Sequence, residues 1–221
     1  AAYGIAEEKL RVIARAIDGA RFDSDRLDRE FLAAKRVEWG TEGHFVVMGV
    51  GRITQLKGYD VLIRAVAKLP ERFKLVLVGE AEALRKDVEE SLRALVAELG
   101  LGSRVVFAGN QQKVAECLAL ADCVVSSNVR KPEAFGRSMA EALAMGKPVV
   151  ARAFGGALDV VRDGTDGVLV AESADYAAAF AVAIEKVSNM TFGDLRAEAL
   201  ERFSFGKMAE QSLAVYKEVT K

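Results

Sequence analysis

Two glutamates, Glu133 and Glu141, have a type and spacing that suit the binding of a large polar ligand. Glu141 lies within residues 137–145, where Ala, Leu and Met are strong helix formers and Gly146 is placed to end the helix. At about 1.5 Å per helical residue, the two carboxylates lie at most about 12 Å apart. That span suits an elongated, hydroxyl-rich molecule across the helix N-terminus, where backbone N–H groups favour an anion such as a diphosphate. It is too wide for the carboxylate pair of a retaining glycosidase, which needs about 5 Å.

Two basic residues, Arg52 and Lys57, are candidates to bind such an anion. They follow the apolar stretch 45–50, and Lys57 lies where the next helix is expected to begin. A cation at a helix N-terminus opposes the helix dipole by roughly 0.3–1 kcal/mol. A bound anion would remove that conflict, with Arg52 as a second contact. Two other phosphate motifs do not fit, because a dinucleotide-binding loop needs glycine at Thr54 and a Walker loop needs Ser or Thr at Pro148.

The elements that must position these side chains alternate regularly between strand and helix. Apolar stretches predict strands at 45–50, 73–78, 104–108, 123–126, 148–151 and 168–170. Helices are predicted at 59–69, 83–99, 112–120, 137–145, 175–187, 194–202 and 206–220. Near-continuous apolar strands separated by helices indicate an α/β fold, a single Rossmann-like parallel sheet with helices on both faces. Ligands of such sheets bind at the carboxyl ends of the strands.

Over roughly residues 10–220, the chain resembles the second half of the retaining GT-B glycosyltransferases of family four, also called glycosyltransferases group 1. The spacing of Glu133 and Glu141 is similar to the family's E-x7-E signature, and residues 51–58 resemble its G-R-x4-K-G loop. The resemblance implies that Glu133 holds hydroxyls of the donor sugar and that Glu141 holds the ribose of the nucleotide. It also implies that Arg52 and Lys57 hold the donor diphosphate and stabilise the charge of the leaving group.

The resemblance also implies the remaining residues of the donor site. Asn110 and Gln111 follow a predicted strand, where the family's loop meets the nucleobase. The catalytic residues that it implies are Glu133, Arg52 and Lys57. The full donor-binding set is Gly51, Arg52, Lys57, Asn110, Gln111, Glu133, Ala134, Phe135, Gly136 and Glu141.

We expect three parts in the chain. Residues 1–40 form a linker, with a strand at 10–17 and a helix capped by Ser24, leading from an absent N-terminal acceptor domain. Residues 41–203 form the nucleotide-sugar-binding Rossmann-like domain. Residues 204–221 form a C-terminal helix that packs back toward the absent domain. The chain begins with Ala rather than Met, which suggests a piece of a longer protein.

The implied function is that of the donor domain of a retaining, metal-independent glycosyltransferase. It would transfer a hexose-type sugar from a nucleotide-diphospho-sugar to an acceptor, either a glycan or a lipid-linked molecule. No cofactor is expected beside this substrate, and the chain alone is expected to be inactive because the acceptor domain is missing. Two alternatives remain. One is a non-catalytic nucleotide-sugar-binding or scaffold subunit, and the other is a nucleotide-sugar epimerase of the same fold, whose acid–base residues have no evident place here.

The composition of the chain bears on its binding partners and on its location in the cell. With 31 basic and 32 acidic residues, the net charge is −1, which gives no electrostatic case for nucleic acid. No apolar run approaches 18 residues, so no transmembrane segment is expected. We expect a cytoplasmic location, with any contact to the inner face of a membrane made through the absent domain. Cys117 and Cys123 lie in apolar stretches and are expected to be reduced core residues.

No metal site is expected. The segment Asp23-Ser24-Asp25 mimics the metal-binding D-x-D motif of the other glycosyltransferase fold, but it lies at a predicted helix cap and not after a buried strand. A single histidine, His44, is too few for a His-based zinc site or catalytic triad.

Overall fold

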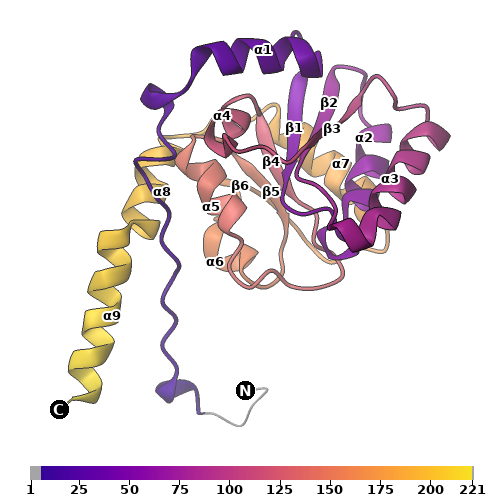
Figure 1. Ribbon diagram of the computed structural model, residues 1–221. Coiled ribbons are helices and arrows are strands. Elements are labelled where there is room, and N and C mark those ends of the chain that lie inside the picture. The colour runs from indigo at the N-terminus through magenta and orange to yellow at the C-terminus, as the bar shows by residue number, and fades with distance from the viewer. Residues whose placement is uncertain (1–5, 221) are drawn as a thin grey trace.

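A six-stranded parallel sheet forms the centre of the computed structural model, which describes residues 6–220 (Figure 1). The strands are β1 (Phe45–Val50), β2 (Phe73–Val78), β3 (Val105–Gly109), β4 (Cys123–Ser126), β5 (Val149–Arg152) and β6 (Gly167–Val170). They lie in the order β3-β2-β1-β4-β5-β6, and each neighbouring pair is parallel. The predicted α/β fold is confirmed, and each predicted strand end lies within one residue of the observed end.

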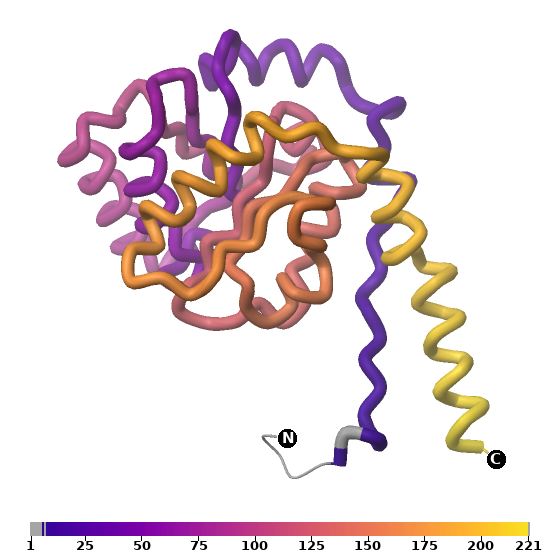
Figure 2. Tube along the Cα trace, turned by 180° about the vertical axis from the view of Figure 1, so that it is seen from behind, coloured from indigo at the N-terminus to yellow at the C-terminus, as the bar shows by residue number. Residues whose placement is uncertain are grey.

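Helices cover both faces of the sheet (Figures 1 and 2). One face carries α1 (Arg29–Trp39), α4 (Val114–Ala119), α5 (Arg137–Ala144), α6 (Ala157–Val160) and α8 (Leu195–Phe203). The other face carries α2 (Tyr59–Ala67), α3 (Lys86–Glu98) and α7 (Tyr176–Val187). Short 3-10 turns lie at Glu7–Lys9, Ser24–Arg26, Gln55–Lys57 and Ala83–Arg85. Helix α6 was not predicted, because four residues are too few to show a helical period.

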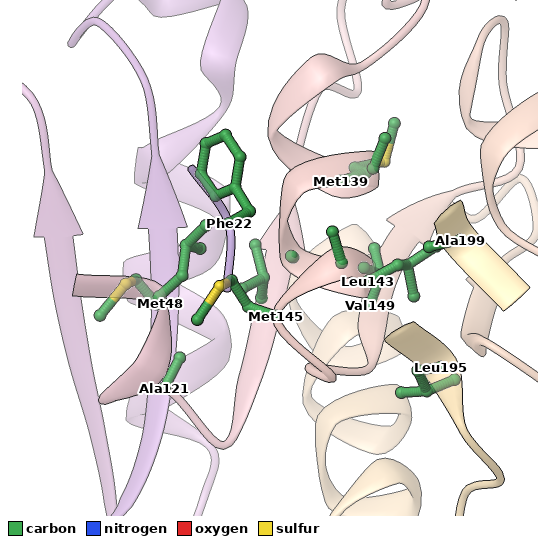
Figure 3. Close-up of a cluster of buried hydrophobic side chains, with 14 of the residues drawn as sticks. Phe22, Met48, Ala121, Met139, Leu143, Met145, Val149, Leu195 and Ala199 are labelled. Atoms are coloured by element: carbon green, nitrogen blue, oxygen red, sulfur yellow. The ribbon is translucent and has the colours of Figure 1, made fainter. Parts of the chain in front are cut away.

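The alternation of side chains along β1 divides the core into two clusters. Val46 and Met48 belong to the cluster under the first helical layer, whereas Val47 belongs to the cluster under the second. Figure 3 shows Met48 in the first cluster, together with Phe22 and Met145. Full burial of a large apolar side chain stabilises the fold by about 1.5–3 kcal/mol. Packing on both faces therefore holds the carboxyl ends of the strands in fixed positions.

The predicted strand at residues 10–17 is wrong. The segment is extended, but it pairs with no strand among the described residues. It lies beside α9 (Phe205–Val219) in both views, and Arg11 forms an ion pair with Glu218 of that helix. A helix satisfies its own backbone groups and cannot offer the ladder of hydrogen bonds that a strand requires. The Ile17 N–H instead donates to the Phe203 carbonyl oxygen at 2.8 Å.

The helix predicted from Ser24 begins later than expected. After the 3-10 turn, the backbone of Leu27 is extended, which prevents one continuous helix. Helix α1 starts behind Asp28, whose carboxylate accepts the Phe31 N–H at 3.0 Å. The expected cap, Ser24, instead lies inside the 3-10 turn, which Asp23 caps.

Helix α9 leaves the body of the domain beside the extended linker segment (Figure 2). Each residue of α9 keeps some exposure, and Leu213 and Tyr216 are among its exposed apolar side chains. That this helix packs back toward another domain stays a prediction. Residues 1–5 of the expected linker and residue 221 of the expected last helix lie outside the described residues. Within the described part of the chain, no helix has both the length and the apolar character to cross a membrane.

Arg196 of α8 fixes the linker to the domain. Its guanidinium donates to the carbonyl oxygens of Gly19 at 3.1 Å, of Ala144 at 2.8 Å, and of Phe22. Ala144 ends α5, where the last carbonyl groups of a helix lack partners within it. Residues 19–22 are therefore held against the end of α5, and Phe22 is buried in the first cluster.

Asp166 is a buried carboxylate that ties the turn before β6 to α8. The carboxylate accepts hydrogen bonds from Arg162 Nε at 2.9 Å and from Arg202 Nη1 at 2.9 Å. Asp166 is only 1% exposed. Burial raises the pKa of Asp166, but the hydrogen bonds from Arg162 and Arg202 outweigh it, so the pKa lies below its ordinary value. The ionised form of this side chain therefore stabilises the fold.

We expect Asp166→Asn to lower the free energy of unfolding near neutral pH by about 1.5–3 kcal/mol, the range for hydrogen bonds to charged groups. The pKa is lower in the folded state than in the unfolded state. The stabilisation is therefore complete above the unfolded pKa of about 3.9 and is lost as the pH falls through the folded value. Urea unfolding of both proteins at about pH 7 and about pH 3 should show the difference between them shrinking in acid. Glu201→Gln, an exposed change on α8, is the control, and a difference independent of pH would contradict this role.

Candidate functional site

A cleft of about 820 Å³ opens at the carboxyl end of β1, beside the first turn of α5. β1 and β4 are neighbours there, and the strand order reverses between them, with β2 and β3 on one side and β5 and β6 on the other. The loops that follow two such strands diverge and leave a crevice in which ligands bind. The cleft brings together five of the predicted residues: Gly51, Arg52, Lys57, Glu133 and Glu141.

The loop after β1 touches the loop after β4 at Gly58. Gly58 has a φ of 66°, in the left-handed region that favours glycine. A Cβ atom at this position would lie 2.0 Å from the Ser127 carbonyl oxygen. The Ser127 hydroxyl donates to the Lys57 carbonyl oxygen at 2.8 Å. Lys57 is therefore positioned by a backbone contact that no larger residue at position 58 permits.

Lys57 and Glu133 form an ion pair in the cleft. Lys57 Nζ lies 2.8 Å from Glu133 Oε2, and the two side chains are 25% and 26% exposed. Asn128 Nδ2 donates to the same oxygen at 3.0 Å. Two donors on one carboxylate oxygen hold it in one orientation. Glu133 is thus the counter-ion of Lys57 in this structure.

Asn128 was not among the predicted residues. It lies two positions after the end of β4, and Ser126 Oγ lies 3.3 Å from its Oδ1 atom. An amide side chain at a strand end is a signal that the sequence offers. The spacing to Glu133 does not show, however, that the loop folds back and brings the two side chains together.

Arg52 lies at the mouth of the cleft. Its side chain is 74% exposed and forms an ion pair with Glu82. Such exposed pairs contribute only about 0.2–1 kcal/mol, so a ligand phosphate can replace Glu82 with little loss. The backbone beside Arg52 is firmer, because the buried Tyr59 hydroxyl donates to the Gly51 carbonyl oxygen at 3.1 Å.

Helix α5 directs its first turn into the cleft. It begins after Gly136, whose φ is 87°, and its first residues Arg137 and Ser138 line the cleft. Glu141 lies one turn further along. Burial raises the pKa of Glu141, and the charges of Arg137, 3.5 Å away, and Arg21 partly offset this. The free N–H groups of a first turn next to a carboxylate suit an anion that is joined to a hydroxyl-bearing group.

A smaller cavity of about 350 Å³ adjoins the cleft on the side of β3. It shares Gly51 and Arg52 with the cleft, and Asn110 and Gln111 line it. The Gln111 side chain donates to the Ala108 carbonyl oxygen, which holds it near the end of β3. The structure therefore places these two predicted residues next to the cleft and not inside it.

A second side cavity of about 370 Å³ adjoins the cleft at Glu133. The predicted residues Ala134, Phe135 and Gly136 line it, together with Arg15 of the linker. The Phe135 ring packs edge-on against Phe203, with the ring centroids 5.6 Å apart. The predicted donor-binding residues are thus distributed over one cleft and its two side cavities.

The linker supplies cations to the cleft that were not predicted. Arg15 and Arg21 both line it. They are held there because Ile17 hydrogen-bonds to Phe203 and Arg196 binds the backbone of residues 19–22. No local sequence pattern indicates that the linker folds across the end of the sheet. Apart from their charge, nothing in the sequence therefore identifies these two arginines as cleft residues.

The described residues contain no cluster of three or more His, Cys, Asp or Glu side chains that could hold a metal ion. Asp23 instead accepts the Asp25 N–H at 3.2 Å and lies 3.5 Å from Arg196. Cys117 and Cys123 are buried and free, as predicted for core residues. Burial raises the pKa of both thiols, that of Cys117 to about 12, which makes them poor ligands and nucleophiles.

The sequence matches a model of one protein family and is similar to several curated proteins. The model of the family "Glycosyl transferases group 1" matches residues 33–203. D-inositol 3-phosphate glycosyltransferases from Acidothermus cellulolyticus and Nocardia farcinica are 32% and 34% identical to this chain. These matches cover 98% and 97% of this chain, but 49% and 48% of the relatives. The chain therefore spans about half the length of these curated relatives.

Solved structures show the same architecture. A glycosyltransferase from Rickettsia africae superposes with a TM-score of 0.87 at 28% identity, covering 99% of this chain and 59% of that one. Anabaena HepE, in complex with UDP and glucose, superposes with a TM-score of 0.83 at 27% identity, covering 97% of this chain and 59% of that one. The chain belongs to the glycosyl transferases group 1 family and has the fold of the C-terminal domain of a GT-B glycosyltransferase.

Proposed function

We propose that this chain is the donor-binding part of a retaining glycosyltransferase that uses a nucleotide-diphospho-sugar and needs no divalent metal. The observation that carries the proposal is the single cleft lined by Arg52, Lys57, Glu133 and Glu141. Its cations suit a diphosphate, and its carboxylates suit the hydroxyl groups on either side of it. The similar structure of HepE in complex with UDP and glucose supports this class of ligand.

The diphosphate is assigned to the centre of the cleft. Arg52 and Lys57 approach it from the loop after β1, and the first turn of α5 approaches it with free N–H groups. When the bond between the sugar and the diphosphate breaks, negative charge grows on the diphosphate oxygen. Cations already held at that position stabilise the charge without rearranging, which lowers the barrier. The sugar passes through an oxocarbenium-like state beside Glu133.

The sugar and the nucleoside are assigned to the two ends of the cleft. Glu133 would accept hydrogen bonds from hydroxyl groups of the sugar, and Glu141 would accept them from the ribose. The base would enter the side cavity of Asn110 and Gln111, which opens beside Arg52.

The two free, buried cysteines are consistent with the reducing cytoplasm, where we place the enzyme.

We expect the chain to bind UDP in the presence of EDTA, because two basic side chains and a helix N-terminus supply positive charge. Arg52→Ala and Lys57→Ala should each weaken UDP binding by about 1.5–3 kcal/mol, the range for hydrogen bonds to charged groups. Isothermal titration calorimetry measures all three affinities. Lys68→Ala, which removes a cation at the far end of α2, is the matched control. Loss of binding in EDTA, or unchanged affinity in both variants, would contradict the assignment.

Substitutions of the two acids should affect the affinities for UDP and UDP-glucose differently. Glu141→Gln should weaken UDP and UDP-glucose by similar factors, because both carry the ribose. Glu133→Gln should weaken UDP-glucose but strengthen UDP by up to roughly fivefold, since Lys57 loses a counter-ion worth about 0.2–1 kcal/mol. Calorimetry of both variants with both ligands tests this. If the two variants change both affinities alike, the separate roles of the acids are wrong.

The 221-residue chain alone should bind donor but transfer no sugar. Holding an acceptor hydroxyl against the donor carbon can supply about 7–11 kcal/mol of the barrier, and the chain spans only half the length of its relatives. A radiolabelled transfer assay should give product only after the first half of the enzyme is added, in the same chain or separately. Glu133→Gln should abolish that product. Transfer by the chain alone would contradict the proposal, and donor binding without turnover in either context would identify a non-catalytic subunit.

A further inference from the structure

The Glu133 end of the cleft has more arginine side chains than a diphosphate requires. Arg52 and Lys57 are assigned to the diphosphate, and each has a carboxylate partner in this structure. Arg15 and Arg137 lie further along, where both line the cleft and the side cavity of about 370 Å³. These two come from separate segments, the linker and the first turn of α5, and meet around Glu133.

Neither of these two guanidinium groups has its hydrogen-bonding capacity filled. Within residues 6–220, Arg15 forms no side-chain hydrogen bond and no ion pair. Arg137 is 69% exposed, and its contact with Glu141 at 3.5 Å is an ion pair without a hydrogen bond. A cation in the first turn of α5 also opposes the helix dipole. An anion bound between these side chains would accept hydrogen bonds from their unused N–H groups. It would also offset the unfavourable interaction of Arg137 with the helix dipole.

The carboxylates of the side cavity do not neutralise this pair of cations. Glu133 lines the cavity, but its charge is compensated by Lys57 and its oxygen already accepts from Asn128. Asp159 also lines the cavity and is an exposed side chain. Glu141, outside this cavity, compensates Arg137 at 3.5 Å, whereas Arg15 has no carboxylate within ion-pair distance among residues 6–220.

We propose that Arg15 and Arg137 bind an anionic group, a phosphate or a carboxylate, of the acceptor. The inference rests on the proposed function, because it takes Glu133 as the residue beside the transferred sugar. The base cavity lies beyond Arg52 and the diphosphate fills the middle, whereas the side cavity that Arg15 and Arg137 line opens at Glu133, on the side assigned to the sugar. The fork of a guanidinium group matches the oxygens of phosphate and carboxylate, whereas a neutral acceptor would leave both forks unused.

The test uses the chain saturated with UDP, so that added anions cannot occupy the diphosphate site. Titration with inorganic phosphate should show binding by calorimetry. Arg15→Ala and Arg137→Ala should each weaken phosphate binding at least about tenfold, and Arg15→Lys, which keeps the charge, should recover part of the loss. Arg26→Ala, an exposed arginine of the same linker segment outside both cavities, should bind phosphate as the wild type does. The UDP affinity of Arg26→Ala should also stay within about twofold of the wild-type value.

Two outcomes would overturn the proposal. One is equal phosphate binding, or none, in the UDP-saturated wild type and in both alanine variants. The other concerns a negatively charged donor sugar as the source of the anion. If Arg15→Ala weakens UDP-glucuronate tenfold but leaves UDP-glucose unchanged, and phosphate does not bind beside UDP, the anion belongs to the donor. Failure of UDP itself to bind would instead contradict the proposed function, and the two failures are therefore distinguishable.

Discussion

The close contact between Gly58 and the Ser127 carbonyl group sets the geometry of the cleft. It joins the loops that leave β1 and β4, two neighbouring strands whose onward connections run to opposite halves of the sheet. These strands are packed on both faces, and close-packed interiors absorb little displacement, so the strand ends cannot move apart for a bulkier residue. Lys57 and Glu133 consequently meet at 2.8 Å although they lie 76 positions apart in the sequence.

The two walls of the cleft are held by different kinds of interaction. The wall formed by the loops after β1 and β4 and by α5 rests on the sheet and on the buried clusters. The wall formed by the linker rests on one backbone hydrogen bond at Ile17, on the guanidinium group of Arg196, and on the burial of Phe22. Arg15 therefore depends for its position on α8, an element far from it in the sequence and outside the cleft.

Local patterns in the sequence predicted the sheet, because long apolar stretches between helices have few other uses. They also predicted Lys57 and Glu133, whose neighbours Gly58 and Gly136 belong to recognisable loops. Asn128 and Arg15 could not be predicted in this way, since their roles depend on how distant segments fold against each other. The segment 10–17 shows the same limit, because an extended chain has one pattern whether it pairs with a strand or lies along a helix such as α9.

The counter-ions of Arg52 and Lys57 bear on how the cleft discriminates among the many anions of a cell. A molecule that offers only negative charge must displace Glu133 from Lys57, and it leaves that carboxylate with Asn128 as its remaining donor. A molecule that joins a diphosphate to hydroxyl groups gives the cations a new anion and gives Glu133 new donors. Under the proposed function, the carboxylates that compete with a ligand for the cations would make the cleft select against charge alone.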